Sequence, residues 1–224
     1  MSERQNNRKK DVYFYPEMLR RIHISFLMFA IALAVNSLAQ SPEYRLETFG
    51  TRDGMLSSKV YALAQTSDRK LWIGTELGVS VYDGYSFTNY QYTSSNETIG
   101  RVLCITQDSL KGIWIGGDKG LFYLHGNSIK KMELQSKTQL AVEALLTDAG
   151  GNVWAGDLNA LFKITPQQIQ QVHKVHPAIV DITPFASFTK RVYCIAEDSK
   201  QNIYVGSYDG VFKIMANANN YEIF

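Results

Sequence analysis

The sequence predicts an all-β protein built from β-propeller blades, each a small sheet of four antiparallel strands. The first observation is a stretch of three strand-like runs and two tight turns that occurs four times without gaps. The second is the spacing of its aromatic anchors, which is 42, 40 and 50 residues. A period of this length is typical of propeller blades. The four copies are Val60–Tyr82, Val102–Leu124, Val142–Ile164 and Val192–Ile214.

The first run of each copy is apolar almost throughout, which suits an innermost strand that is buried on both faces. Its third residue is always small, as expected where blades taper toward the propeller axis. These residues are Ala62, Cys104, Ala144 and Cys194. The two cysteines lie two blades apart, whereas a disulfide needs Cα atoms within about 7 Å. We therefore expect two buried free thiols.

The second run carries an aromatic ring and, two residues later, a glycine on the same face of the strand. A large ring beside a bare backbone lets the neighbouring blade approach closely. The turn before it holds Asp, Gly and Asn, which suit a tight hairpin. We expect the following anchors to lie between blades: Trp72, Gly74, Trp114, Gly116, Trp154, Gly156, Tyr204 and Gly206.

The turn between the second and third runs has glycine in three copies and Ala160 in the other. Alanine resists a positive φ. Two outcomes follow for this copy: Asn159 takes the left-handed conformation, or the turn changes its type.

Outer strands follow the repeats, and they set the blade boundaries. Tyr85–Tyr90 and Tyr221–Phe224 are the expected outer strands of the first and last blades. Tyr44–Phe49 alternates in the same way but precedes the first copy, so we interpret it as an orphan closing strand. On this basis we expect the chain to be a fragment that forms an open arc of blades. The strand that pairs with 44–49 would then lie beyond the C-terminus. The propeller region is 40–224, with blades at about 60–90, 102–132, 142–172 and 192–224.

Residues 1–39 are interpreted as a signal peptide. The run Ile24–Val35 is apolar over 12 residues and follows Arg20 and Arg21, and small residues at Ser37 and Ala39 predict cleavage after Ala39. Twelve residues are too few to cross about 30 Å of hydrocarbon as a helix. The alternative is an uncleaved anchor that extends into the flanks of the run. Either reading predicts export, and we expect a periplasmic location.

The charge of the exported part argues against nucleic acid as a partner. The chain has 23 basic and 21 acidic residues, of which residues 1–39 hold six and three. The remaining 17 basic and 18 acidic residues leave a net charge of −1. A nucleic-acid-binding domain is expected to be clearly basic.

The repeats resemble the two-component regulator propeller repeat in the runs that end in Asn-Val-Trp-Ala-Gly or Leu-Trp-Ile-Gly. The entry Asp53-Gly54-Met55-Leu56-Ser57-Ser58 and the exit Tyr82-Asp83-Gly84-Tyr85-Ser86-Phe87 are similar to those of such propellers. The resemblance covers about residues 44–214. Departures are Thr66 for the turn Asp, Ala160 for the turn Gly and Tyr204 for the Trp.

This resemblance implies an incomplete part of a seven-bladed propeller in an extracytoplasmic sensor, typical of Bacteroidota. In the family, a transmembrane helix and a histidine kinase or regulator module follow downstream, and full-length relatives are expected to dimerise. A glycan fragment is the implied ligand. We expect no enzyme activity or cofactor in this chain, and a membrane connection only through the missing downstream segment or an uncleaved signal.

The candidate ligand-binding residues precede the inner strands. Lys59, Arg101 and Arg191 occupy this position in three copies, and Ala141 occupies it in the other. Inner strands start at the same end of the axis, so these residues would form a basic arc on one rim, suited to an acidic sugar. The alternative is a set of solvated charges at strand ends.

The long connection Gln167–Lys190 is the second candidate, because long loops on a uniform scaffold often carry specificity. Its alternative is a longer outer strand with a solvated turn. His173 and His176 lie in it, but no third ligand has the spacing of a metal site. We therefore predict no metal.

Two functions remain open from the sequence. The first is a fragment of a ligand-sensing propeller of a two-component receptor, which detects a glycan fragment. The alternative is a free-standing secreted propeller that binds a protein or glycan without signalling, and a propeller lyase or hydrolase is a third, weaker interpretation. A continuing reading frame with a kinase would distinguish the first from the second.

Overall fold

The structure is a computed structural model that describes residues 20–30, 45–134, 141–174, 182–187, 191–215 and 221–223. The chain divides into two units, Met1–Glu47 and Thr48–Phe224. In the first unit, residues 20–30 are helical and exposed. None of the described helices is long and apolar enough to cross a membrane. The predicted cleavage site at Ala39 lies outside the described residues.

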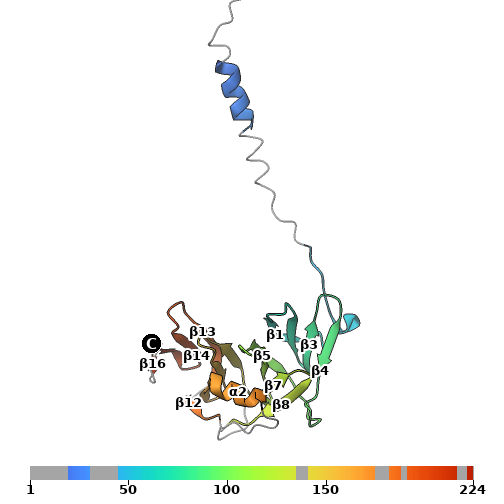
Figure 1. The fold of residues 1–224 in the computed structure, drawn as a ribbon, viewed down its shortest axis with the longest axis vertical. Coiled ribbons are helices and arrows are strands. Elements are labelled where there is room, and N and C mark those ends of the chain that lie inside the picture. The colour runs from blue at the N-terminus through green and yellow to red at the C-terminus, as the bar shows by residue number, and fades with distance from the viewer. Residues whose placement is uncertain are drawn as a thin grey trace, which may run out of the picture. The chain divides into compact units, whose positions relative to one another are not determined.

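The second unit consists of four separate four-stranded antiparallel sheets, one for each repeat, and the predicted propeller blades are confirmed. Within each sheet the strands follow chain order from the inner to the outer edge (Figure 1). Blade 1 comprises β1 (Val60–Gln65), β2 (Leu71–Thr75), β3 (Gly78–Tyr82) and β4 (Phe87–Tyr90), and blade 2 comprises β5 (Val102–Gln107), β6 (Ile113–Gly117), β7 (Gly120–His125) and β8 (Ser128–Met132). Blade 3 comprises β9 (Ala144–Thr147), β10 (Val153–Gly156), β11 (Ala160–Ile164) and β12 (Pro184–Ser187), and blade 4 comprises β13 (Val192–Glu197), β14 (Ile203–Ser207), β15 (Gly210–Ile214) and β16 (Tyr221–Ile223).

The hydrophobic core lies between consecutive blades. Trp72 packs with the Ile113–Ile115 strand of blade 2, Trp114 with blade 3, and Trp154 with blade 4. The three indoles are 6%, 0% and 2% exposed. A buried ring of this kind contributes about 3–5 kcal/mol relative to alanine.

The glycine anchors are where the blades approach most closely. A Cβ placed on Gly116 would lie 2.8 Å from Cγ1 of Val142 in the next blade and 2.5 Å from Sγ of Cys104 in its own blade. The same arrangement surrounds Gly74 and Gly156. The small third residue of the inner strand is thus needed beside this glycine.

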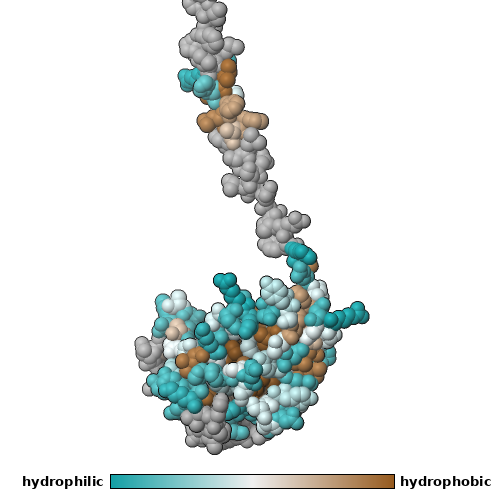
Figure 2. All heavy atoms as spheres, turned by 45° about the vertical axis from the view of Figure 1, so that its right-hand side comes forward, coloured by the Kyte–Doolittle hydropathy of each residue, from teal (hydrophilic) through white to brown (hydrophobic). Residues whose placement is uncertain are grey.

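The inner strands at the two ends of the row are more exposed than predicted. In β1, Val60, Tyr61 and Leu63 are exposed, and Cys194 in β13 is exposed as well. Burial on both faces is therefore wrong for β1 and β13, because neither has a second neighbouring blade among the described residues. On the side shown in Figure 2, hydrophobic residues reach the surface of this unit among hydrophilic ones.

The predicted closing strand at 44–49 has no partner strand among the described residues. Residues 45–49 form no strand, and Leu46 is 95% exposed. A strand needs a ladder partner, and the partner expected for 44–49 is not among the described residues, so its closing role stays a prediction. Phe49 instead packs against Tyr82 and Phe87, at ring-centroid distances of 5.1 and 5.9 Å.

Blade 3 departs from its predicted boundary at residue 172. A helix, α2 (Pro166–Lys174), follows β11, and the outer strand β12 comes only after it. The capping arrangement explains the helix start: Thr165 N–H donates to Oε1 of Gln168 over 2.9 Å, and Pro166 occupies the first position. Ile169 and Val172 then pack into the core between blades 2 and 3.

The hairpin turns differ from the predicted use of Gly or Asn at positive φ. Arg69, Lys111 and Gln201 have φ of 65°, 66° and 64°, and only the blade 3 turn has a glycine there, Gly151. In the later turn of blade 3, neither Asn159 nor Ala160 has a positive φ. The carboxylate of Asp157 accepts both of their backbone N–H groups, so this turn changes its type.

Candidate functional site

The candidate site is the rim at which the inner strands begin. Inner strands pack in chain order, β1 against β5, β5 against β9 and β9 against β13. Lys59, Arg101 and Arg191 each directly precede the first residue of their strand. Their placement at strand starts is therefore as predicted, and each side chain has its own partner.

Arg101 lies over an aromatic ring of the preceding blade. Its guanidinium carbon is 5.5 Å from the ring centroid of Tyr61, the second residue of β1. A carboxylate oxygen of Asp118 accepts the Arg101 backbone N–H over 2.9 Å. This cation–π contact connects blades 1 and 2 and leaves guanidinium N–H donors at the rim.

Arg191 makes the corresponding contact between blades 3 and 4. Its Nη1 lies 3.3 Å from Oε1 of Glu143, which occupies the inner-strand position equivalent to Tyr61. Burial raises the pKa of the Glu143 carboxyl, and the Arg191 guanidinium opposes that rise. The ion pair therefore offsets part of the effect of burial on this half-buried carboxyl group.

Lys59 has a partner within its own blade. Its Nζ lies 3.1 Å from both carboxylate oxygens of Glu76, in the turn between β2 and β3. Two of the three predicted cations thus face carboxylates, so the rim combines both charges rather than forming a continuous basic arc.

Two exposed tyrosines belong to the same rim and were not predicted. Tyr61 and Tyr193 occupy the second position of β1 and β13, one residue after the strand begins. The signal was the column Tyr61, Leu103, Glu143 and Tyr193, which breaks the apolar pattern of the inner strands. Of the two, Tyr61 has the Arg101 guanidinium over its ring.

The second candidate, around His173, is partly described. The imidazole of His173 lies 3.8 Å from that of His125, and its Nδ1 is 3.1 Å from the Tyr123 hydroxyl. These contacts hold α2 against blade 2. His176 lies outside the described residues, and the described residues contain no group of three or more potential metal ligands.

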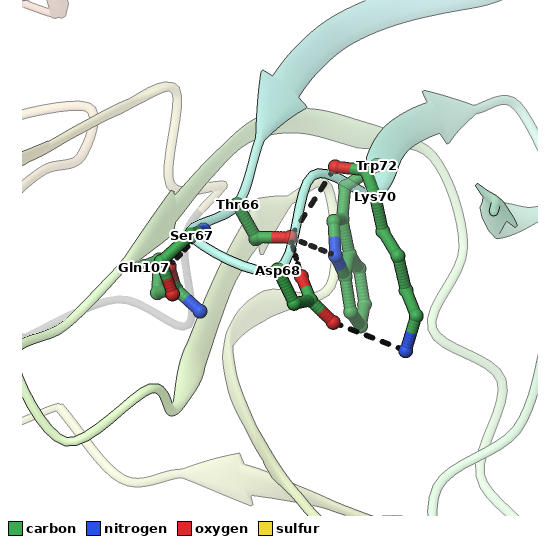
Figure 3. Close-up of polar contacts among 6 residues, drawn as sticks. All are labelled: Thr66, Ser67, Asp68, Lys70, Trp72 and Gln107. Atoms are coloured by element: carbon green, nitrogen blue, oxygen red, sulfur yellow. Dashed lines mark hydrogen bonds and ion pairs between the residues drawn. The ribbon is translucent and has the colours of Figure 1, made fainter. Parts of the chain in front are cut away.

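The polar turns are structural, and blade 1 shows how a departure from the repeat is accommodated. In blades 2 and 3, Asp108 and Asp148 accept the indole N–H of the blade's tryptophan over 2.9 and 2.7 Å. In blade 1, the hydroxyl of Thr66 accepts it from Trp72 over 3.2 Å (Figure 3). Asp68 accepts a hydrogen bond from that hydroxyl and pairs with Lys70, 3.0 Å away.

Two stretches of the sequence, in blades 1 and 4, match a known family of repeats. A sequence model of the two component regulator propeller matches residues 54–76 and 187–209, which include β1–β2 and β13–β14. These two stretches are similar to the two-component regulator propeller repeat. Over 80 residues it is also 28% identical to histidine kinase P4 of Formosa agariphila, a match that covers 36% of this chain and 6% of that protein.

Solved structures with the same fold include extracellular domains of two hybrid two-component systems from B. thetaiotaomicron. They are 19% and 17% identical, with TM-scores of 0.61 and 0.58, and cover 82% and 79% of this chain. The chain spans only 23% and 24% of those two proteins. Virginiamycin B lyase from Staphylococcus aureus, 14% identical with a TM-score of 0.57, is similar over 75% of this chain and 55% of its own. At these identities the likeness establishes the propeller fold alone.

Proposed function

We propose that this chain is part of an extracytoplasmic, non-catalytic propeller that senses a ligand for a two-component signalling receptor. The observation that carries the proposal is the match of two blades to the two-component regulator propeller. The predicted signal peptide supports export to the periplasm. The similarity to extracellular domains of two-component systems agrees with this location.

We further propose that the ligand is an acidic glycan fragment held at the rim of Lys59, Arg101 and Arg191. The exposed rings of Tyr61 and Tyr193 supply surfaces for sugar stacking, and the cations supply charge-assisted hydrogen bonds. Each such bond contributes about 1.5–3 kcal/mol. A carboxylate or sulfate on the sugar would compete with Glu76 for Lys59 and with Glu143 for Arg191.

Calorimetric titration of the chain with uronic and sulfated oligosaccharides tests this ligand. Arg101→Ala and Arg191→Ala should each weaken binding roughly tenfold or more, since one charge-assisted bond is lost. Lys131→Ala, on the outer strand β8, should leave the affinity unchanged. Because both arginines also connect blades, a melting temperature for each variant is needed beside its affinity.

A charge-removal variant separates binding from structural support. Glu76→Gln releases Lys59 from its partner without removing a cation, so affinity for an acidic sugar should rise. If this variant and both arginine variants bind an active oligosaccharide as the wild type does, the rim is not the site.

The free-standing binding module remains the other candidate function. DNA sequence beyond the codon for Phe224 distinguishes the two. A continuing frame with a membrane span and a histidine kinase supports the receptor, and a stop codon supports the module.

A further inference from the structure

The helix α2 packs into the seam between blades 2 and 3, in the interior of the row of blades. Blade 2 also contacts blade 1, and blade 3 also contacts blade 4. The buried residues Ile169 and Val172 of α2 belong to one core cluster with Trp114 of blade 2 and Phe162 of blade 3. The docked position of α2 is therefore set by blades that have neighbours on both sides.

A pair of histidines joins the C-terminal end of α2 to blade 2. His173 is the last but one residue of α2, and His125 is the last residue of β7. Their ring centroids are 3.8 Å apart, with an angle of 50° between the ring planes. Both side chains are half-buried. Because imidazole is the side chain that ordinarily changes its charge near neutral pH, this contact can respond to acid.

The tyrosine beside the pair is fixed by its own blade. Tyr123 is 2% exposed and packs on Trp114 at a ring-centroid distance of 4.7 Å, and a Cβ on Gly112 would overlap its hydroxyl oxygen. Burial raises the pKa of Tyr123, so the hydroxyl stays neutral. It lies 3.1 Å from Nδ1 of His173, and a hydroxyl can either donate to this nitrogen or accept from it. A first proton on His173 therefore leaves this hydrogen bond intact.

The charged groups around the pair tolerate one imidazolium better than two. Asp108, in the turn between β5 and β6, acts electrostatically on the Tyr123 hydroxyl, and the C-terminal end of a helix also favours a cation. Lys130 on β8 pairs with Tyr123 in the ladder and so lies on the same face of the sheet, and Lys174 directly follows His173. Blade 3 contributes apolar residues to this seam. One carboxylate thus stands against two lysines.

We infer that α2 is an acid-released latch on blade 2, which stays docked while His125 or His173 is neutral and opens when both are charged. Two positive charges this close repel each other, and opening separates them. The open state therefore takes up the second proton more readily than the docked state. Docking weakens as the pH falls below about 6.5, where free imidazoles titrate. Opening uncovers Ile169 and Val172 at the start of the long connection.

This latch requires no ligand and is independent of the proposed rim site. Hydrogen exchange of the 224-residue chain, measured by peptide mass spectrometry from about pH 7.5 to about pH 5, tests it. The protection factors of α2 amides, corrected for the intrinsic effect of pH on exchange, should fall roughly tenfold over this range, which corresponds to about 1.4 kcal/mol. Those of β6 should stay constant. A parallel fall in β6 would overturn the latch, because blade 2 would then unfold together with α2.

The variant His125→Gln separates charge from packing. Glutamine stays neutral, so α2 should lose its acid response, and a purely structural role of His125 would instead lower the protection equally at every pH. His125→Lys carries a permanent charge, so protonation of His173 alone should release α2 and the release should shift to higher pH. The matched control is His23→Gln, which removes a histidine in 20–30 and should keep the wild-type response.

Two results would contradict the latch in addition to unfolding of blade 2. The first is constant protection of α2 in the wild type between about pH 7.5 and about pH 5. The second is an acid response that persists in His125→Gln, because a group other than this pair would then control the opening.

Discussion

The indole N–H of Trp114 donates to Oδ2 of Asp108 over 2.9 Å, while Oδ1 of the same aspartate accepts the backbone N–H groups of Leu110 and Gly112. One buried carboxylate thus closes the turn and orients the ring that fills the seam to blade 3. Local turn formation and packing between blades are coupled through these two residues.

Asp108→Ala should destabilise the fold by about 2–4 kcal/mol, because it leaves three donors, two of them buried, without an acceptor. Urea denaturation measures the change. Asp198→Ala is the matched control, since Asp198 holds the equivalent turn and Tyr204 at the more exposed blade 4. Its loss should be clearly smaller. If the two variants lose the same free energy of unfolding, Asp108 stabilises only its own turn and not the packing between blades.

Gly156→Ala should destabilise the seam between blades 3 and 4 by about 1–3 kcal/mol through overpacking. Its new Cβ would lie 2.4 Å from Val192 Cγ1 and 2.9 Å from Val192 Cβ. Calorimetric melting of the purified chain gives the comparison with the wild type.

The valine is responsible for this effect only if shortening it restores the space. Val192→Ala combined with Gly156→Ala should therefore lose less stability than the sum of the two single variants. Strict additivity of the two losses in this double-mutant cycle would show that Val192 is not the residue against which the new methyl group of Gly156→Ala is overpacked.

The blade pattern could be predicted from the sequence because one repeat has to satisfy the same neighbours each time. Trp72, Trp114 and Trp154 recur in register for that reason, and each lies between blades. The ends of the row break this symmetry. Cys194 has the sequence context of Cys104, but no blade among the described residues covers it, so the repeat predicted the wrong burial.

Features of single blades were the least predictable. The helix α2 has its own local signal, Thr165-Pro166-Gln167-Gln168, but the repeat pattern favoured a loop or a longer strand there. At the rim, the strand-start position of Arg191 could be predicted from its column. Its pairing with Glu143 depends on the offset between neighbouring inner strands, which the sequence does not encode locally.

Lys111→Gly should stabilise the chain by about 0.5–1 kcal/mol, because a lysine at φ 66° has a conformation that glycine adopts without steric cost. Gly151→Ala tests the reciprocal change at the equivalent turn of blade 3, where φ is 79°, and should destabilise by a similar amount. Chemical denaturation of both variants gives the free energies of unfolding. Changes of the same sign would show that turn conformation is not the cause.

Acid should weaken the blade 1 turn through Asp68. The hydrogen bond from Thr66 is the main cause that lowers the pKa of Asp68, and Lys70 adds to it against the effect of burial. The ionised form therefore stabilises the fold. This contribution is complete above the ordinary pKa of about 3.9 and is lost as the pH falls through the lower folded-state pKa.

Asp68→Asn should consequently be less stable than the wild type near neutral pH, and the difference should shrink as the pH falls from about 5 to 2. Thermal melts across this pH range measure the difference in melting temperature between the variant and the wild type. A difference that stays constant with pH would exclude Asp68 as a titrating group in the fold.

Thr165→Ala should loosen α2, because its side chain and Gln168 form the reciprocal cap at the start of the helix. Loss of a threonine cap costs about 1 kcal/mol. Since Ile169 and Val172 of α2 belong to the core between blades 2 and 3, the loss should appear both as faster amide exchange in α2 and in global stability. Gln170→Ala, at an exposed position of the same helix, is the control and should change neither. Faster exchange in α2 with unchanged global stability would mean that the helix opens separately from the blades, and that its two apolar residues do not hold the seam together.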